Sequence, residues 1–534
     1  MNTIAPRAPT PFLPPHNASP PAASNQSTQR PPTPALGEAR GLPASLEGSD
    51  LVPKVKETRL VDDGNLTAYN TSLTIQFDAK NQVLIDDSLT LETGDHADNI
   101  HVRNHTDGRL KVEVNGKSYL FNVRNEKDGK PTQLYIKSKA GDDHITIDAD
   151  VMLPVKVEAG DGDDYVKAGG GPSRLFGGKG KDYLQLGSGP GYAEGNDDDD
   201  TMVGGTGNAI MYGNNGNDRM YAGAGPATKR SHLDGGNGND QMYAGNGHTV
   251  MNGGKNDDLM VGHDSTTFYS GKGWDIVRSN NRNDRIYAKT TDRIISPAGA
   301  TWVPITPDES GKKGLNIQGT PDFKQRVEDD FELLRSSPVG QKMLAALDDA
   351  AVKNGAPVHI KSGEKELFDM DQEHREKTRY TFTNTTTDDN STPPTQEDNE
   401  SPKNGFVRNG VRGIANTDGT IFYDPSSRYD YHALKSAPVT NFYHEMAHAY
   451  NGATGSFLPG STPEQVGDGP AEDTPNAERQ AVGLPTTADP FDFDNDPLTP
   501  PTSTNPEALT ENAIRKEMGY ARRNTYTVKS HSQH

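Results

Sequence analysis

A nine-residue repeat runs from residue 159 to about residue 287, and it constrains the fold of this 534-residue chain more than any other feature. Units such as GNNGNDRMY and GGNGNDQMY place glycines at the first positions and a large apolar residue at the eighth. Six residues of each unit suit a tight turn, and the remaining three suit a short strand. We therefore expect two units to complete one coil of a parallel β-roll, with the coils stacked on one another.

The eighth position of the repeat supports this frame. It holds Val166, Leu175, Leu184, Met202, Met211, Met220, Met242, Met251 and Met260, so half of the chain's 12 methionines stand there. Because this position recurs once per short strand, we predict that these side chains stack as an apolar ladder inside the roll. Methionine is an adaptable filling for such a core.

The sixth position alternates between aspartate and other residues. Asp164, Asp182, Asp200, Asp218, Asp240, Asp258 and Asp275 recur mostly 18 residues apart, which is one full coil and places all of them on one edge. The opposite edge receives Ser173, Gly191, Ala209, Ala227 and Thr249, together with the four extra residues of the unit 222–234. Calcium binds carboxylate and carbonyl oxygens, and glycine lets turn carbonyls point inward. We predict calcium on the aspartate edge and none opposite; a metal-free glycine-rich solenoid or a disordered linker is the alternative.

The unit resembles the RTX-type nonapeptide G-G-x-G-x-D-x-U-x, in which U is a large apolar residue, and this resemblance implies Ca²⁺ binding.

Around the roll, the composition changes several times. We predict a multidomain chain in which a parallel β-roll or β-solenoid precedes an α+β domain. We expect that domain to be a zincin-like metallopeptidase domain, because it contains the motif His444-Glu445-x-x-His448. The expected parts are a disordered export leader (1–50), a β-rich segment leading into the solenoid (51–158), the β-roll (159–287), a linker (288–320) and the peptidase domain (321–534), with a mobile loop at 369–404.

The predicted peptidase domain contains a two-histidine motif, His444-Glu445-x-x-His448. Residues four apart share one face of a helix, so His444 and His448 can hold one zinc ion while Glu445 reaches a water molecule beside it. We expect Ser436 to cap this helix, with Pro438 in its first turn and Gly452 at its end. Histidines that merely fill the core or lie on the surface are the alternative.

Two histidines leave a catalytic zinc site incomplete, because such a site uses three protein ligands and one open position. We predict Glu478 as the third ligand, on a short helix 30 residues after His448. Its rivals are Asp468, Glu472 and Asp473 in the acidic stretch before that helix. In the predicted mechanism, zinc activates a water molecule, Glu445 is the general base, and an additional donor stabilises the oxyanion. The candidate donors are Tyr520, Tyr526, Arg522 and Arg523.

Composition excludes several classes of function. The net charge of −21 argues against nucleic acid as a partner, and the absence of cysteine excludes disulfides and cysteine-ligated zinc. No apolar run approaches the length of a membrane span. No general secretory signal peptide is visible at the N-terminus.

Residues of about 321–526 resemble the type III effector zinc metallopeptidases, the NleD-like effector proteases. The resemblance rests on five segments, namely Ser337-Pro338-Val339-Gly340, Ile421-Phe422-Tyr423-Asp424-Pro425, the motif around His444, Glu478-Arg479-Gln480-Ala481-Val482, and Glu511-Asn512-Ala513-Ile514-Arg515-Lys516-Glu517. It implies a secreted bacterial zinc endopeptidase that is injected into the host cell cytoplasm and cleaves host proteins. It also implies secretion machinery or a chaperone as a partner.

The long roll departs from this family, whose compact members lack one, and it leaves the route and the substrate open. RTX rolls fold when they meet millimolar calcium outside the cell, whereas host cytosol is poor in calcium. Extracellular action is therefore the alternative localisation. The alternative function is a non-enzymatic, calcium-binding, RTX-like solenoid that acts as an adhesin or binding module with an inactive protease-like end.

Overall fold

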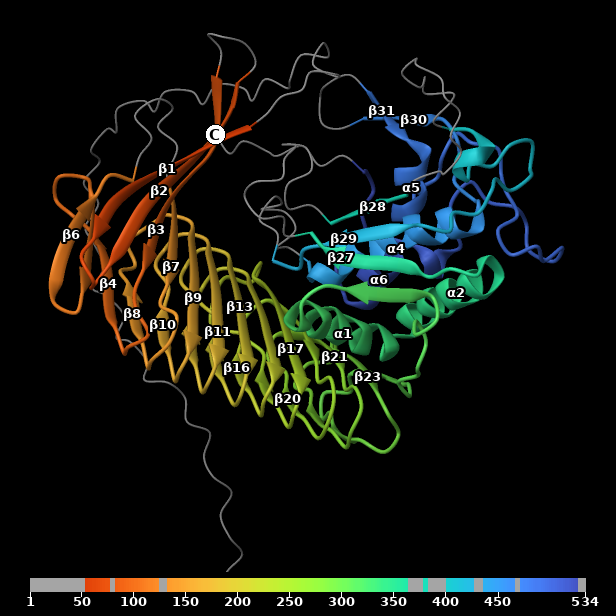
Figure 1. Cartoon of the computed structure of the whole chain (residues 1–534). Coiled ribbons are helices and arrows are strands. Elements are labelled where there is room, and N and C mark those ends of the chain that lie inside the picture. The colour runs from red at the N-terminus through yellow and green to blue at the C-terminus, as the bar shows by residue number, and fades with distance from the viewer. Residues whose placement is uncertain are drawn as a thin grey trace, which may run out of the picture. The chain divides into compact units, whose positions relative to one another are not determined.

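The computed structural model describes residues 53–76, 82–123, 132–363, 378–382, 400–426, 436–465 and 471–526. The predicted leader 1–50 lies outside these residues, as does most of the predicted loop 369–404. Figure 1 shows the stacked strands of the solenoid and the mixed helices and strands that follow it. No helix in the described ranges is long and apolar enough to cross a membrane. The predicted fold class, a β-solenoid followed by an α+β domain, is confirmed.

The solenoid consists of two sheets, and successive strands of the roll belong alternately to one sheet and to the other. The larger sheet contains, in spatial order, β1 (Pro53–Asp62), β2 (Thr67–Gln76), β3 (Gln82–Glu92), β7 (Gln133–Lys137), β9 (Val155–Asp161), β11 (Ser173–Lys179), β13 (Gly191–Asp197), β15 (Ala209–Asn215), β17 (Arg230–Asn237), β19 (His248–Asn252), β21 (Ser265–Tyr269), β23 (Arg285–Ala288) and β25 (Thr301–Pro304). The other contains β6 (Lys117–Phe121), β5 (Leu110–Val114), β4 (Asn99–Asn104), β8 (His144–Ile147), β10 (Tyr165–Lys167), β12 (Tyr183–Gln185), β14 (Thr201–Val203), β16 (Arg219–Tyr221), β18 (Gln241–Tyr243), β20 (Leu259–Val261), β22 (Ile276–Arg278) and β24 (Arg293–Ile295).

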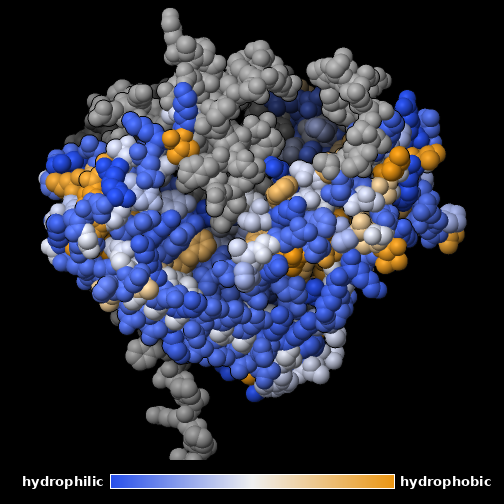
Figure 2. Space-filling model, in the orientation of Figure 1, coloured by the Kyte–Doolittle hydropathy of each residue, from blue (hydrophilic) through white to orange (hydrophobic). Residues whose placement is uncertain are grey.

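The register of the parallel strands follows the nine-residue frame. Val166 pairs with Leu184, which pairs with Met202, and Met220, Met242 and Met260 continue the same line in the smaller sheet. All these side chains are fully buried, and so are Leu175, Met211 and Met251 in the larger sheet. The predicted apolar ladder is therefore confirmed, and it consists of two facing columns. Many outward-pointing residues are polar, although Val203, Leu259 and Val261 also point outward. Most of the solenoid face visible in Figure 2 is hydrophilic.

One position on the edge opposite the aspartates differs from the prediction. Ser173, Gly191 and Ala209 are in register as expected, but the next member of the column is Ser231, and Ala227 is exposed. The four extra residues of this unit lie in the turn before β17, so the strand position comes four residues later than the regular frame places it.

The strands extend beyond both ends of the predicted roll. Antiparallel hairpins add β1 and β2 to the larger sheet and β5 and β6 to the smaller one, while β3 and β4 pair in parallel with β7 and β8. At the other end, β24 and β25 complete a further coil within the segment 288–320, for which the sequence predicted a linker. The sequence did not predict β24 and β25 because their apolar residues form only short runs between prolines and glycines.

A four-stranded sheet forms the centre of the C-terminal domain, in the order β26 (Leu315–Gln318), β27 (Val358–Ser362), β29 (Thr420–Tyr423) and β28 (Arg379–Thr381). β26, β27 and β29 are parallel, and β28 is antiparallel at the end of the sheet. The helices are α1 (Pro321–Arg335), α2 (Pro338–Asn354), α4 (Pro438–Thr454), α5 (Asn476–Val482) and α6 (Glu511–Glu517), and a hairpin joins β30 (Ser461–Glu464) to β31 (Glu472–Pro475). α4 packs against α2, β28 and β29.

Both predicted ends of the motif helix are wrong by a few residues. Ala437, not Ser436, is the N-cap of α4 and provides no side-chain hydrogen bond. The helix continues past Gly452 to Gly455, which takes the left-handed conformation with φ 63°. Gly452 is needed for close packing, since a Cβ there would lie 2.3 Å from the Tyr380 hydroxyl oxygen.

The last coils of the solenoid pack on the C-terminal domain. Val250, Tyr269 and Tyr287 belong to the same apolar core as Phe442 and Ile514. A polar contact reinforces this packing, because the Tyr269 hydroxyl donates to the Glu517 carboxylate of α6 at 3.0 Å. The guanidinium of Arg326, in α1, lies 3.3 Å from the ring centroid of Tyr212 in β15. The roll is thus part of the support of the C-terminal domain.

We expect Met220→Ala to destabilise the roll strongly. Its side chain is fully buried, and removing such a side chain from a packed core costs about 2–5 kcal/mol. Met152→Ala is the matched control because Met152 is 65% exposed. Thermal unfolding of both variants in chelator measures the effect. Equal unfolding midpoints for the two variants would show that the methionine column does not hold the coils together.

Candidate metal centres

The helix α4 presents the two histidines of the motif on one face. Its apolar residues Phe442, Tyr443 and Met446 are buried against the sheet and the neighbouring helices. This packing fixes the helix orientation and turns His444 and His448 toward α5. Both histidines are themselves largely buried. The sequence therefore folds locally as expected for two ligands one helical turn apart.

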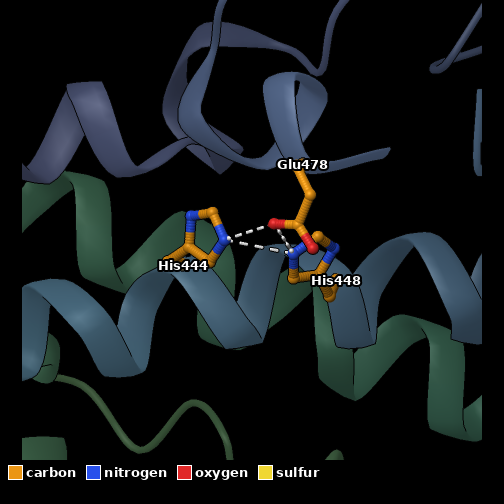
Figure 3. Close-up of side chains that lie close together, drawn as sticks. All are labelled: His444, His448 and Glu478. Carbon is orange, nitrogen blue, oxygen red and sulfur yellow. Dashed lines mark hydrogen bonds and ion pairs between the residues drawn. The ribbon is translucent and has the colours of Figure 1, made fainter. Parts of the chain in front are cut away.

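Glu478 of α5 completes a group of three converging ligand atoms (Figure 3). Its Oε2 lies 3.2 Å from His444 Nε2 and 3.1 Å from His448 Nε2, and the two Nε2 atoms are 3.1 Å apart. Ligand atoms about 2.0–2.1 Å from a tetrahedral zinc ion lie roughly 3.3 Å from one another. The three atoms thus have a spacing that fits one zinc ion, and they leave one side of the group for a further ligand.

The charges around His444 favour a cation at this position. Burial alone would lower the pKa of His444, but hydrogen bonds to the carboxylates of Glu478 and Glu511 outweigh it and raise the pKa to about 10. The Glu511 Oε2 atom lies 3.1 Å from His444 Nδ1, on the far side of the ring from Glu478. A carboxylate in this place orients a metal-binding imidazole and raises its basicity.

Glu511 was not among the residues predicted for the site. It is almost fully buried, and Arg523 and Arg515 donate to its two carboxylate oxygens. The sequence offered one signal, since Glu511 begins the last segment that carries the resemblance to the effector peptidases. Its contact with His444 joins residues that are 67 positions apart, so only the fold shows it.

Glu445 lies close to the two histidines and Glu478 and is partly buried. The Tyr380 backbone N–H, in β28, donates to its Oε2 at 2.7 Å. Burial raises the pKa of Glu445, while the nearby His444 and His448 act in the opposite direction. A carboxyl group with a raised pKa is suited to accept and return a proton near neutral pH. β28 falls within the predicted mobile loop 369–404, where the sequence predicted no strand.

The other predicted ligands and donors have different surroundings. Glu472 and Asp473 are exposed in the hairpin strand β31, and Asp468 lies outside the described residues. Tyr520 is buried against His248 of the solenoid, and Arg522 is paired with Glu507 at the surface. Arg523 binds Glu511, whereas the Tyr526 hydroxyl hydrogen bonds to Glu478. Of the four candidate donors, Tyr526 is the one that reaches the group of His444, His448 and Glu478.

The sixth-position aspartates form a continuous row along one edge of the solenoid. The backbone N–H of each donates to Oδ1 of the aspartate in the next coil, at distances between 2.8 and 3.3 Å. The row also includes Asp98 and Asp143 at its start and Asp292 at its end. Each of these three precedes an apolar strand residue by two positions, as Asp164 precedes Val166. That spacing was the available signal, although the nine-residue frame is broken there.

The second carboxylate oxygen of most row members is buried and has no hydrogen-bond partner. This holds for Oδ2 of Asp98, Asp143, Asp164, Asp182, Asp200, Asp218, Asp240 and Asp258. The glycine at the first position of the unit makes room for it. A Cβ added to Gly195 would lie 2.1 Å from Asp200 Oδ2 and 3.0 Å from the carbonyl oxygen of Gly213 in the next coil. Carboxylate and carbonyl oxygens therefore converge on one small space per coil, as calcium requires.

Burial without a compensating positive charge raises the pKa of the aspartates in this row. Burial raises the pKa to about 7 at Asp164, to about 8 at Asp182 and to about 9 at Asp200. A buried carboxylate with no partner is costly, and either a proton or a cation removes this cost. The row therefore has the chemistry of a cation site.

We expect acid to stabilise the solenoid in the absence of calcium. The unfolded carboxyls ionise near pH 4, whereas the folded ones hold their protons up to about pH 7 to 9. The folded state thus binds more protons in this range, and the unfolding midpoint in chelator should rise as the pH falls from about 9 to 5.

Calcium should reverse this trend, because it needs ionised carboxylates, so its stabilising effect should grow as the pH rises. Thermal unfolding followed by circular dichroism at several pH values, with and without calcium, tests both halves. A calcium-free midpoint that rises with pH would contradict the burial of this row.

Comparison with known families agrees with both sites. Residues 311–526 match the model of peptidase family M91, described as an effector protein. Residues 158–192, 194–226 and 230–251 match the RTX calcium-binding nonapeptide repeat in its form with 4 copies. No curated protein and no solved structure gives a significant match. Both resemblances drawn from the motifs are confirmed: the C-terminal part matches an effector peptidase family, and the coils before it match a calcium-binding repeat.

Proposed function

We propose that this protein is a secreted bacterial effector with a zinc endopeptidase domain that cleaves host proteins. The observation that carries the proposal is the convergence of His444 Nε2, His448 Nε2 and Glu478 Oε2 near the partly buried carboxyl group of Glu445. The description of the matched family as an effector protein supports a host substrate. We propose the host cytoplasm as the destination and secretion machinery or a chaperone as a partner.

His444, His448 and Glu478 are the proposed zinc ligands, and Glu511 holds the His444 ring in place from behind. Zinc, when bound there, supplies a Lewis acid that polarises the scissile carbonyl group and lowers the pKa of water. Glu445 takes the proton of the attacking water and passes it to the leaving amine. The Tyr526 hydroxyl, next to Glu478, is the proposed donor to the oxyanion. Six of the predicted row aspartates are the proposed calcium ligands, namely Asp164, Asp182, Asp200, Asp218, Asp240 and Asp258. The seventh, Asp275, is paired with Lys289 instead.

The sheet suggests how a peptide substrate is held. β29 is paired on both sides, with β27 and with β28, so it has no free edge for a substrate. β28 is the terminal strand of this sheet as described, and its Tyr380 touches Glu445. We propose that an extended substrate aligns with β28, because strand addition there brings its backbone next to the general base.

Glu445→Gln should abolish cleavage while the domain still binds zinc. The amide keeps the shape of the side chain but cannot take a proton, so the rate should fall by about 10²–10⁴-fold. Incubation of host-cell lysate with the full chain, followed by mass spectrometry of new N-termini, measures cleavage, and elemental analysis measures zinc. Glu472→Gln is the control, because Glu472 is an exposed rival carboxylate. Cleavage that survives both Glu445→Gln and a zinc chelator would refute the proposal.

Glu511→Gln should weaken zinc binding about 10–100-fold, because the neutral amide orients and polarises His444 less well. Competition of the full chain with a chromophoric chelator measures the zinc affinity directly. Glu507→Gln is the matched control, since Glu507 pairs with Lys516 and Arg522 at the surface. An unchanged zinc affinity in Glu511→Gln, with normal folding, would mean that the contact between Glu511 and His444 has no part in metal binding.

A further inference from the structure

At the C-terminal end of the aspartate row, the second carboxylate oxygen is no longer without a partner. Oδ2 is buried without a partner at every member up to Asp258, but Oδ2 of Asp275 and of Asp292 is bonded. The same lysine, Lys289, supplies the positive charge at both. The change occurs in the coils of Tyr269 and Tyr287, which are among the coils that contact the C-terminal domain.

Lys289 binds this end of the row as a cation would. Its Nζ lies 2.8 Å from Asp275 Oδ2, 3.1 Å from Asp292 Oδ2 and 2.5 Å from the carbonyl oxygen of Gly271. The Ser270 hydroxyl oxygen is 3.4 Å away. The lysine side chain is 12% exposed, and both aspartate side chains are fully buried. Two carboxylates and a turn carbonyl are the ligands that a hard cation takes, and an ammonium group is a compact charge with three donors.

A buried lysine also binds carbonyl oxygens on the opposite edge of the solenoid. In the coil with four extra residues, Lys229 is buried, and its Nζ donates to the carbonyl oxygens of Gly205 and Ala222 at 2.5 Å each. The carbonyl oxygens of Gly223 and Ala224 follow at 3.3 and 3.2 Å. A lysine ammonium bonded to carbonyl oxygen therefore occurs on each edge of the solenoid, with four carbonyl groups around Lys229 and one carbonyl group and two carboxylates around Lys289.

We propose that Lys289 is a tethered cation that takes the place of calcium at the C-terminal end of the aspartate row. The calcium positions then end with Asp258, and the coils beyond it are charge-balanced by the chain itself. The part of the roll that carries the contacts of Tyr269 and Tyr287 with the C-terminal domain thus keeps its structure where calcium is scarce. This inference is independent of the proposed peptidase activity, since it concerns the solenoid alone.

Lys289→Met tests the proposal in the full chain, because methionine keeps the length of the side chain and removes its charge. The vacated ligands should then accept calcium. Native mass spectrometry in calcium should show one more bound ion per chain than in the unchanged protein. In chelator the unfolding midpoint should fall, and millimolar calcium should restore it. Lys179→Met is the matched control, since Lys179 pairs with Asp161 on the exposed surface of the same solenoid, and its calcium count should stay the same.

An unchanged calcium count in Lys289→Met would overturn the proposal, whatever happens to its stability, because Lys289 would then be an ordinary ion-pair partner. If the variant does not fold, the unchanged protein decides the question. In its crystal structure with millimolar calcium, ions should lie beside the row as far as Asp258, with the ammonium still between Asp275 and Asp292. A calcium ion bound to those two carboxylates, with the lysine displaced, would equally overturn it.

Discussion

Carboxylate groups that need a positive charge beside them are the constraint on which this structure depends. In the solenoid, the stacking of the coils leaves one buried carboxylate oxygen without a hydrogen-bond partner in almost every turn of the aspartate edge. In the C-terminal domain, α4 and α5 bring a carboxylate and two imidazoles close enough together to bind one zinc ion. Both arrangements are expensive without positive charge and favourable with it. Both halves of the molecule therefore contain groups whose negative charge a cation would balance.

The two halves are also joined mechanically. α6 is only 7 residues long, yet its Glu511 contacts His444, and its Glu517 accepts hydrogen bonds from Tyr269 of the solenoid and from the Val339 backbone in α2. At the end of this helix, the Met518 carbonyl oxygen lies 2.7 Å from His248 Nε2 and accepts from the Thr267 hydroxyl. The last coils therefore hold the helix that positions the first histidine. The coils that hold α6 include the coil of Thr267, to which our proposal assigns charge balance by Lys289.

The sequence predicted the parts of the fold that repeat or follow a short motif. The nine-residue period determined the coils, their register and the apolar columns around Met220, because each position depends only on its neighbours nine and eighteen residues away. The sequence also predicted that His444 and His448 lie together, because only one helical turn separates them. Contacts between distant segments were not readable. Glu511, β28 and the ion pair of Lys289 with Asp275 depend on how separate elements pack, and Ala227 was misplaced because four extra residues shift the frame locally.

X-ray absorption at the zinc edge of the zinc-loaded full chain tests the central claim most directly. The account predicts a single shell of nitrogen and oxygen atoms at about 2.0–2.1 Å, with the back-scattering of two imidazole rings. The signal of one ring should be lost in His448→Ala. A zinc site without imidazole back-scattering, or one that is the same in that variant, would contradict the assignment of this domain as a two-histidine zinc peptidase.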